Sequence, residues 1–86
     1  MRVFFSKKFR KTYNKLDISI REKFKARVRL FKENKFNELL RNHSVDPPYK
    51  NTRSINITGD YRALFIEMDG DAIFFTNIGA HGELYS

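Results

Sequence analysis

The chain has 86 residues, a net charge of +7 at pH 7, 41% hydrophobic residues and no cysteine. This length and composition predict a single domain over residues 1–86, argue against disorder, and exclude disulfide bonds and thiolate metal sites. No apolar run approaches the ~20 residues that span a bilayer, and the N-terminal apolar stretch is too short for a secretion signal, so we expect a cytoplasmic protein without a membrane partner.

The N-terminal segment predicts a short strand followed by a helix. Residues 2–6 have strand character, and Ser6 is suited to cap the start of the helix. One apolar stripe at helical spacing then runs over residues 7–16, made by Phe9, Tyr13 and Leu16.

A longer helix is expected over residues 19–34. Ser19 and Glu22 have the spacing of a capping box at its start. Four apolar residues then recur on a single face, namely Ile20, Phe24, Val28 and Phe31. The two segments together predict an antiparallel helix pair with its aromatic face inside and its basic face outside.

Three runs of strand character follow a proline-containing loop, at residues 53–57, 61–68 and 72–78. The Asp-Gly pair between the second and third runs signals a hairpin, so we expect an antiparallel meander. Alternation in the first run should turn Ile55 and Ile57 toward the helices and leave Ser54 and Asn56 on a more open surface. The predicted fold class is α+β, with two N-terminal helices packed on a small twisted antiparallel sheet.

Positive charge is concentrated in the first half of the chain. Residues 1–41 hold 14 Lys and Arg against 4 Asp and Glu, whereas residues 42–86 hold 3 against 6. This asymmetry favours a polyanionic partner, although a solvated basic helix surface would also produce it. For an RNA partner we expect phosphate contacts from Arg21, Lys25, Arg29, Lys32, Lys50 and Arg53.

Titratable and cationic residues collect at the predicted strand ends and turns: His43, Lys50, Arg53, Asp60, Arg62 and His81. Since a sheet brings strand ends together, we expect them on one rim, where they suit metal-independent cleavage of RNA by its own 2′-hydroxyl. A base takes the hydroxyl proton, an acid protonates the leaving 5′-oxygen, and a guanidinium holds the phosphate. The pattern alone is also typical of surface histidines and of strand-edge charges that discourage aggregation.

Three segments resemble the RelE/YafQ superfamily of type II toxins, and its YafQ-like branch in particular. They are the run from Leu40 to Phe65, the Asp69-Gly70-Asp71 hairpin and the stretch from Ile78 to Tyr85. The resemblance covers essentially the whole chain. It implies an mRNA endoribonuclease that acts on the ribosome without cofactor or metal, and an antitoxin whose acidic segment wraps the toxin in a hetero-oligomer.

Site residues follow from the resemblance position by position. His81 matches the family's C-terminal catalytic histidine, the general acid, and Arg62 matches the arginine that contacts the scissile phosphate. His43 matches a loop histidine that is a candidate base or phosphate ligand. Asp60 matches an acidic residue of the active site, and Tyr85 matches an aromatic residue that stacks on or orients a base.

Two positions depart from the family pattern. YafQ-like enzymes often carry an aspartate and a histidine where this chain has Ser54 and Asn56, and neither of these can act as a base near neutral pH. The base stays open between His43, Asp60 and a group on the ribosome. Two other functions also stay open: a toxin of the same fold that poisons another target, as the ParE branch does with gyrase, and a non-catalytic binding module. The presence of His81 counts against the ParE branch, which lacks a catalytic histidine.

Overall fold

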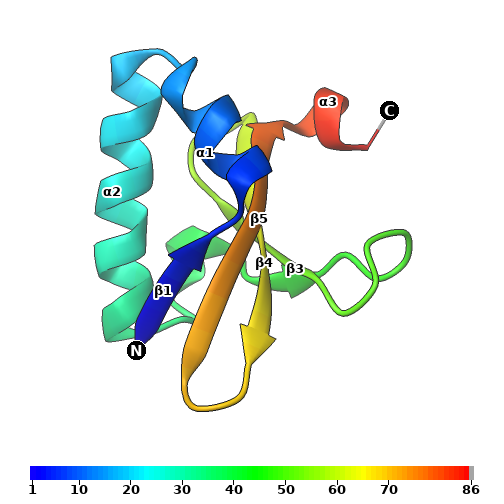
Figure 1. Cartoon of the computed structure of the whole chain (residues 1–86). Coiled ribbons are helices and arrows are strands. Elements are labelled where there is room, and N and C mark those ends of the chain that lie inside the picture. Colours follow the sequence, from blue (N-terminus) through cyan, green and yellow to red (C-terminus); the bar gives the residue numbers. More distant parts are fainter. Residues whose placement is uncertain (86) are drawn as a thin grey trace.

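Two helices lie against one side of a five-stranded sheet in the computed structural model, which describes residues 1–85 (Figure 1). The strands are β1 (Arg2–Phe5), β2 (His43–Ser44), β3 (Arg53–Asn56), β4 (Tyr61–Met68) and β5 (Ala72–Ala80). The helical elements are α1 (Lys7–Asn14), α2 (Ile18–Glu33), the 3-10 turn η1 (Glu38–Leu40) and α3 (His81–Leu84). The predicted α+β class, with two N-terminal helices on a sheet, is confirmed.

The strand order is β1-β5-β4-β3-β2. Strands β3, β4 and β5 form the predicted antiparallel meander, and β2 adds to its outer edge in the antiparallel sense. Strand β1 lies parallel to β5, with Arg2 opposite Ala72 and Phe5 opposite Phe75. No hairpin joins these two strands, so the local turn signals that fix the meander carry no information about the direction of β1.

The starts of the two long helices have different capping residues. The Ser6 hydroxyl accepts a hydrogen bond from the Phe9 amide at 2.9 Å, which confirms the predicted cap of α1. The predicted capping box of α2 is wrong, because Asp17 caps this helix and accepts from the Ser19 amide at 3.2 Å. The Ser19 hydroxyl also donates to the Asp17 carboxylate and thereby lowers the pKa of that group.

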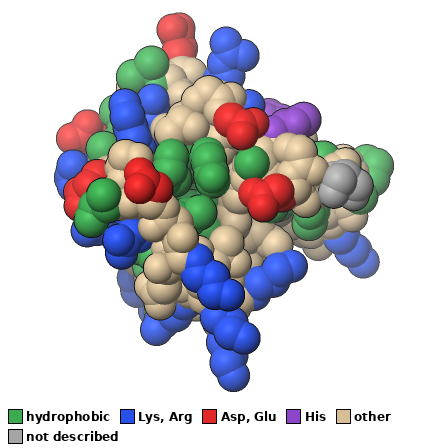
Figure 2. Space-filling view, turned by 90° about the horizontal axis from the view of Figure 1, so that it is seen from above, with side chains coloured by type: hydrophobic (Ala, Val, Ile, Leu, Met, Phe, Trp, Pro, Cys, Tyr) green, Lys and Arg blue, Asp and Glu red, His purple; other side chains and the backbone are tan. Residues whose placement is uncertain are grey.

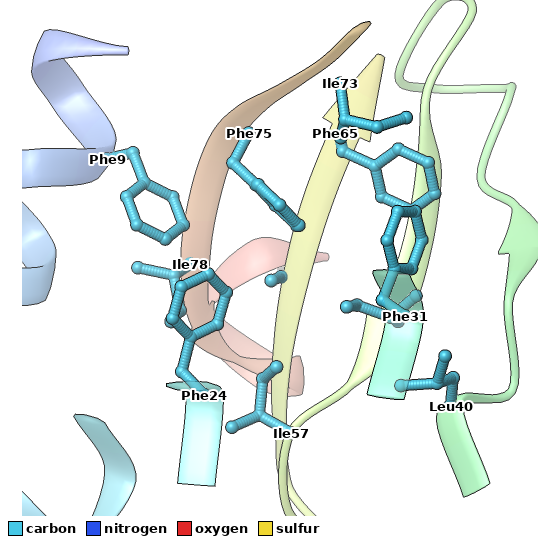
Figure 3. Close-up of a cluster of buried hydrophobic side chains, with 11 residues drawn as sticks. Phe9, Phe24, Phe31, Leu40, Ile57, Phe65, Ile73, Phe75 and Ile78 are labelled. Carbon is cyan, nitrogen blue, oxygen red and sulfur yellow. The ribbon is translucent and has the colours of Figure 1, made fainter. Parts of the chain in front are cut away.

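Aromatic rings from both layers fill the core (Figure 3). Phe31 of α2 meets Phe65 of β4 edge-on at 5.1 Å between ring centroids, and Phe24 meets Phe75 of β5 at 5.3 Å. Burial of each such side chain stabilises the fold by about 1.5–3 kcal/mol. The helical apolar spacing in the sequence therefore marked the packed faces of α1 and α2.

The other face of the sheet is more covered than expected. Ser54 was expected on an open surface, but it is fully buried, and its hydroxyl has no hydrogen-bond partner within residues 1–85. The reason is its place in the register, because Ser54 lies between His43 of β2 and Leu64 of β4, itself fully buried. Asn56 is half-buried and lines a pocket on this face.

Candidate active site

The strand register sets two neighbouring side chains on the sheet face opposite the helices. Asn56, Arg62 and Gly79 are direct partners across β3, β4 and β5. The next row, which includes Ile55 and Ala63, belongs to the hydrophobic core. Because side chains alternate along a strand, Asn56 and Arg62 point away from α1 and α2.

A pocket of about 670 Å³ opens on this face, within the range of about 300–1,000 Å³ that small-molecule sites occupy. Four of the five residues predicted to be catalytic line it, namely His43, Arg62, His81 and Tyr85. They come from β2, β4, α3 and the residue after α3. Segments almost forty residues apart in the sequence thus converge on one site.

His81 is the first residue of α3, and the turn from β5 into this helix sets its position. The His81 amide donates to the Asp60 carbonyl at 2.9 Å, and the Glu83 carboxylate accepts from the Ala80 amide at 2.9 Å. Helix α3 packs over Gly79, where a Cβ atom would lie at an ordinary contact distance of 3.5 Å from Leu84 Cδ2. The imidazole is therefore held at the end of β5, beside the strand that carries Arg62.

Two tyrosines support this short helix. The Tyr85 ring lies 4.8 Å from the His81 ring, between centroids, and packs edge-on against Tyr49 at 6.0 Å. The Tyr49 hydroxyl donates to the Leu84 carbonyl at 2.6 Å. The loop between β2 and β3 is thereby fastened to α3, and both contribute to the walls of the pocket.

Backbone carbonyls hold the guanidinium of Arg62. Its Nη1 atom donates to the carbonyls of Thr58, Gly59 and Tyr61 at 3.1–3.3 Å. A guanidinium carries five N–H donors in a planar fork, so these bonds orient the group without exhausting its capacity to bind a phosphate.

His43 is positioned by the residue two places before it. Its Nδ1 atom lies 2.6 Å from the Arg41 carbonyl oxygen. Arg41 also lines the pocket, and its backbone is left-handed with φ 48°. Sequence reasoning missed Arg41, because neither its spacing nor its neighbours distinguish it from the other exposed arginines.

Two predicted residues lie elsewhere. Asp60 is not one of the described residues that line the pocket. Its backbone carbonyl accepts a hydrogen bond from the His81 amide, and its side chain is exposed. Arg53 donates to the Asn42 side chain at 2.7 Å, and its guanidinium lies over the Phe36 ring at 5.8 Å. Arg53 is paired with Phe65 in the register, on the helix side of the sheet. The structure thus gives Arg53 a structural contact on the other side of the sheet.

The cations predicted to bind RNA differ in their exposure and contacts. Of the cations predicted to bind RNA, Lys50, Arg29 and Lys32 are exposed, Lys25 pairs with Glu22 at 3.7 Å, and Arg21 is half-buried with its Nε atom lacking a partner. Helix α1 and its C-cap residue hold four further exposed lysines and no acidic residue. They are Lys7, Lys8, Lys11 and Lys15, and within residues 1–85 none of them forms an ion pair.

One lysine of α1, Lys8, lies near the end of the sheet that carries His81. Lys8 and Thr12 share a small depression with Gly79, Glu83 and Leu84. In the view from above, most Lys and Arg side chains gather along the lower part of the face and histidine lies at its upper right, so the depression that Lys8 shares with α3 is at the margin of the positive surface (Figure 2). The sequence signal for this surface was present in the composition of α1, which carries cations at four-residue spacing.

No group of three or more His, Cys, Asp or Glu side chains within residues 1–85 could hold a metal ion. None of the helices described is long and apolar enough to cross a bilayer.

Several solved structures share this architecture over nearly the whole chain. YafQ from Escherichia coli BL21(DE3) superposes with a TM-score of 0.76 at 18% identity and covers 100% of both chains. The chain has the RelE/YafQ toxin fold. A YoeB/ParE toxin from Agrobacterium tumefaciens gives a TM-score of 0.77 at 18% identity over 94% of this chain and 99% of its own.

The RelE/YafQ fold also relates the chain to a toxin solved with its antitoxin. The RelB–RelE antitoxin–toxin complex from Methanococcus jannaschii matches with a TM-score of 0.72 at 23% identity, over 95% of this chain and 94% of that one. No protein-family model matches the sequence, and no curated protein sequence matches it. The resemblance read from the sequence is therefore confirmed at the level of the fold.

Proposed function

We propose that the protein is the toxin of a type II toxin–antitoxin system and a metal-independent endoribonuclease that cuts mRNA on the ribosome. The observation that carries this proposal is the convergence of His81, Arg62 and His43 on one pocket. The RelE/YafQ fold, shared over the whole chain with toxins of such systems, supports it.

In the proposed reaction, a base removes the proton of the 2′-hydroxyl, and the resulting oxygen attacks the adjacent phosphorus. The bond from phosphorus to the 5′-oxygen breaks, and His81 gives its proton to that oxygen. The products are a 2′,3′-cyclic phosphate and a free 5′-hydroxyl. Arg62 binds the non-bridging phosphate oxygens and stabilises the charge that they gain in the transition state.

His43 is the best-placed group for the base. It lines the pocket with His81 and Arg62, whereas the Asp60 side chain is exposed and Ser54 is buried. Asn56 lines the pocket but has no titratable group. Tyr85 stands beside His81 and offers its ring for stacking on a base of the RNA.

The partners follow from charge. We assign the contacts with ribosomal RNA mainly to Lys7, Lys8, Lys11 and Lys15, of which Lys8 shares a depression with Gly79 and Glu83 at the end of the sheet that carries His81. Such contacts supply affinity and placement without reading sequence. The same cations suit an acidic segment of an antitoxin in a hetero-oligomer, and both partners would be met in the cytoplasm.

A second candidate is a non-catalytic or ParE-like toxin that acts by binding another target. Its support is that neither Ser54 nor Asn56 can titrate near neutral pH, so the pocket lacks two acid–base groups that YafQ-like relatives often have.

Expression of the chain alone in cells, with mRNA ends mapped beside His81→Ala and Arg62→Ala, separates the candidates. The proposal requires in-frame cuts within open reading frames that disappear in both variants. Growth arrest with intact mRNA, or normal growth, would favour the second candidate.

A further inference from the structure

Arg41 adopts a backbone conformation that its side chain does not favour. It follows η1 with φ 48° and ψ 47°, in the left-handed region. Residues with a side chain seldom occupy this region, and those that do cluster at functional sites. The Arg41 amide donates to the Glu38 carbonyl at 3.2 Å, so the conformation closes η1.

The segment after η1 is fastened on both sides. The Asn42 side chain donates to the Lys35 carbonyl at 2.9 Å and accepts from Arg53 at 2.7 Å. His43 then enters β2 opposite Ser54. The carbonyl of Arg41 is thus held at a fixed place relative to the His43 ring.

This arrangement decides which nitrogen of His43 carries a proton. A carbonyl oxygen can only accept a hydrogen bond, so the 2.6 Å contact with Arg41 requires a hydrogen on Nδ1. In the neutral ring the lone pair is then on Nε2. Free neutral imidazole side chains favour the opposite tautomer, so the protein imposes this state.

We infer that Arg41 is a positioning residue whose left-handed backbone holds His43 as the Nδ1–H tautomer, with Nε2 as the atom that accepts the 2′-hydroxyl proton. The role of Nε2 toward RNA rests on the proposed function. The tautomer itself does not, since it depends on the bond between His43 and Arg41 alone.

Two substitutions separate the Arg41 backbone from its side chain. Arg41→Gly removes the side chain but keeps the left-handed conformation accessible at no steric cost. Arg41→Val removes the same charge and disfavours that conformation, because a β-branched residue is strongly excluded from it. A loss common to both variants measures the guanidinium, and a loss confined to Arg41→Val measures the backbone.

The test is a long-range ¹H–¹⁵N correlation spectrum of the full chain, at a pH where the rings are neutral, with the signals of His43 assigned by their disappearance in His43→Gln. We expect the Nδ1–H pattern in the wild type and in Arg41→Gly, and a shift toward Nε2–H in Arg41→Val. Circular dichroism of each variant shows that it is folded. An Nε2–H ring in the wild type overturns the inference whether or not Arg41→Val folds, and so does an unchanged tautomer in Arg41→Val.

Cleavage provides the second readout. With the base misplaced, mRNA cutting on ribosomes should fall about a hundredfold further in Arg41→Val than in Arg41→Gly. Equal cutting by Arg41→Gly and Arg41→Val would contradict the assignment of His43 Nε2 as the base. An uncut mRNA with the wild-type protein would instead count against the proposed ribonuclease, and the measured tautomer would stand unaffected.

Discussion

Arg62 and Gly79 are direct partners across β4 and β5, and this pairing brings a guanidinium beside the strand end from which His81 projects. Helix α3 packs over Gly79, with Leu84 Cδ2 and Glu83 Oε1 at 3.5 and 3.6 Å from the place of a Cβ atom. The position of His81 therefore depends on a residue that contributes no functional group.

Gly79→Leu is expected to impair cleavage more than stability. A Cβ atom alone fits at ordinary contact distance, but a leucine side chain would displace α3 and move the His81 ring. A displacement of about 1 Å in a reacting group can cost about a hundredfold in rate, and we expect a loss of that order in mRNA cutting on ribosomes.

Gly82→Leu is the matched control for this substitution. A Cβ atom at Gly82 would meet no other atom of residues 1–85 within 4 Å, so the same added volume should leave cutting nearly unchanged. An equal loss of mRNA cutting in Gly79→Leu and Gly82→Leu would contradict the account, because the effect would then not depend on the packing of α3 over Gly79.

The aromatic core predicts a contrast between a phenylalanine of α2 and one in the turn that follows it. Phe31 is fully buried against Phe65, whereas Phe36 is 59% exposed. Phe31→Ala should lower the free energy of unfolding by about 3–5 kcal/mol, through lost burial and the cavity that remains. Phe36→Ala should lower it by less than about 1 kcal/mol, mostly by loss of its cation–π contacts. Urea denaturation of both variants measures the difference, and similar midpoints would contradict the packing described.

The salt dependence of ribosome binding should identify the basic surface. Each phosphate contact contributes about 0.7–0.9 to the slope of log affinity against log salt concentration. Replacing Lys7, Lys8, Lys11 and Lys15 by glutamine should flatten this slope substantially. The control replaces four cations of α2, namely Lys23, Lys25, Arg29 and Lys32, and changes the net charge equally. A larger effect of the α2 substitutions would instead assign the contacts with ribosomal RNA to α2.

Periodicity and turn chemistry accounted for most of the fold. The apolar stripes located α1 and α2, the Asp-Gly pair located the hairpin between β4 and β5, and Ser6 marked the start of α1. These signals are local, so they can be read from the sequence without knowledge of the tertiary structure. The parallel pairing of β1 and the burial of Ser54 depend on contacts between distant segments, for which the sequence holds no local signal.

The pocket could be predicted only in part. The sequence predicted two histidines and an arginine at strand ends, and in the structure these three residues line one pocket. It also suggested Asp60, whose side chain is exposed and does not line the pocket, and Arg53, whose guanidinium donates to Asn42. Arg41 was beyond reach, because its contribution is a backbone conformation and a carbonyl bond rather than a residue type.

The central claim is that His81 protonates the 5′-oxygen while Arg62 holds the same phosphate. The most direct test uses ribosome-bound mRNA in which sulfur replaces the bridging 5′-oxygen at the cut, because a thiolate leaves without a proton. We predict that His81→Ala, inactive on ordinary mRNA, cuts the sulfur-containing mRNA at nearly the wild-type rate, whereas Arg62→Ala stays slow on both. Equal impairment of His81→Ala on the two mRNAs would contradict the assignment of His81 as the acid.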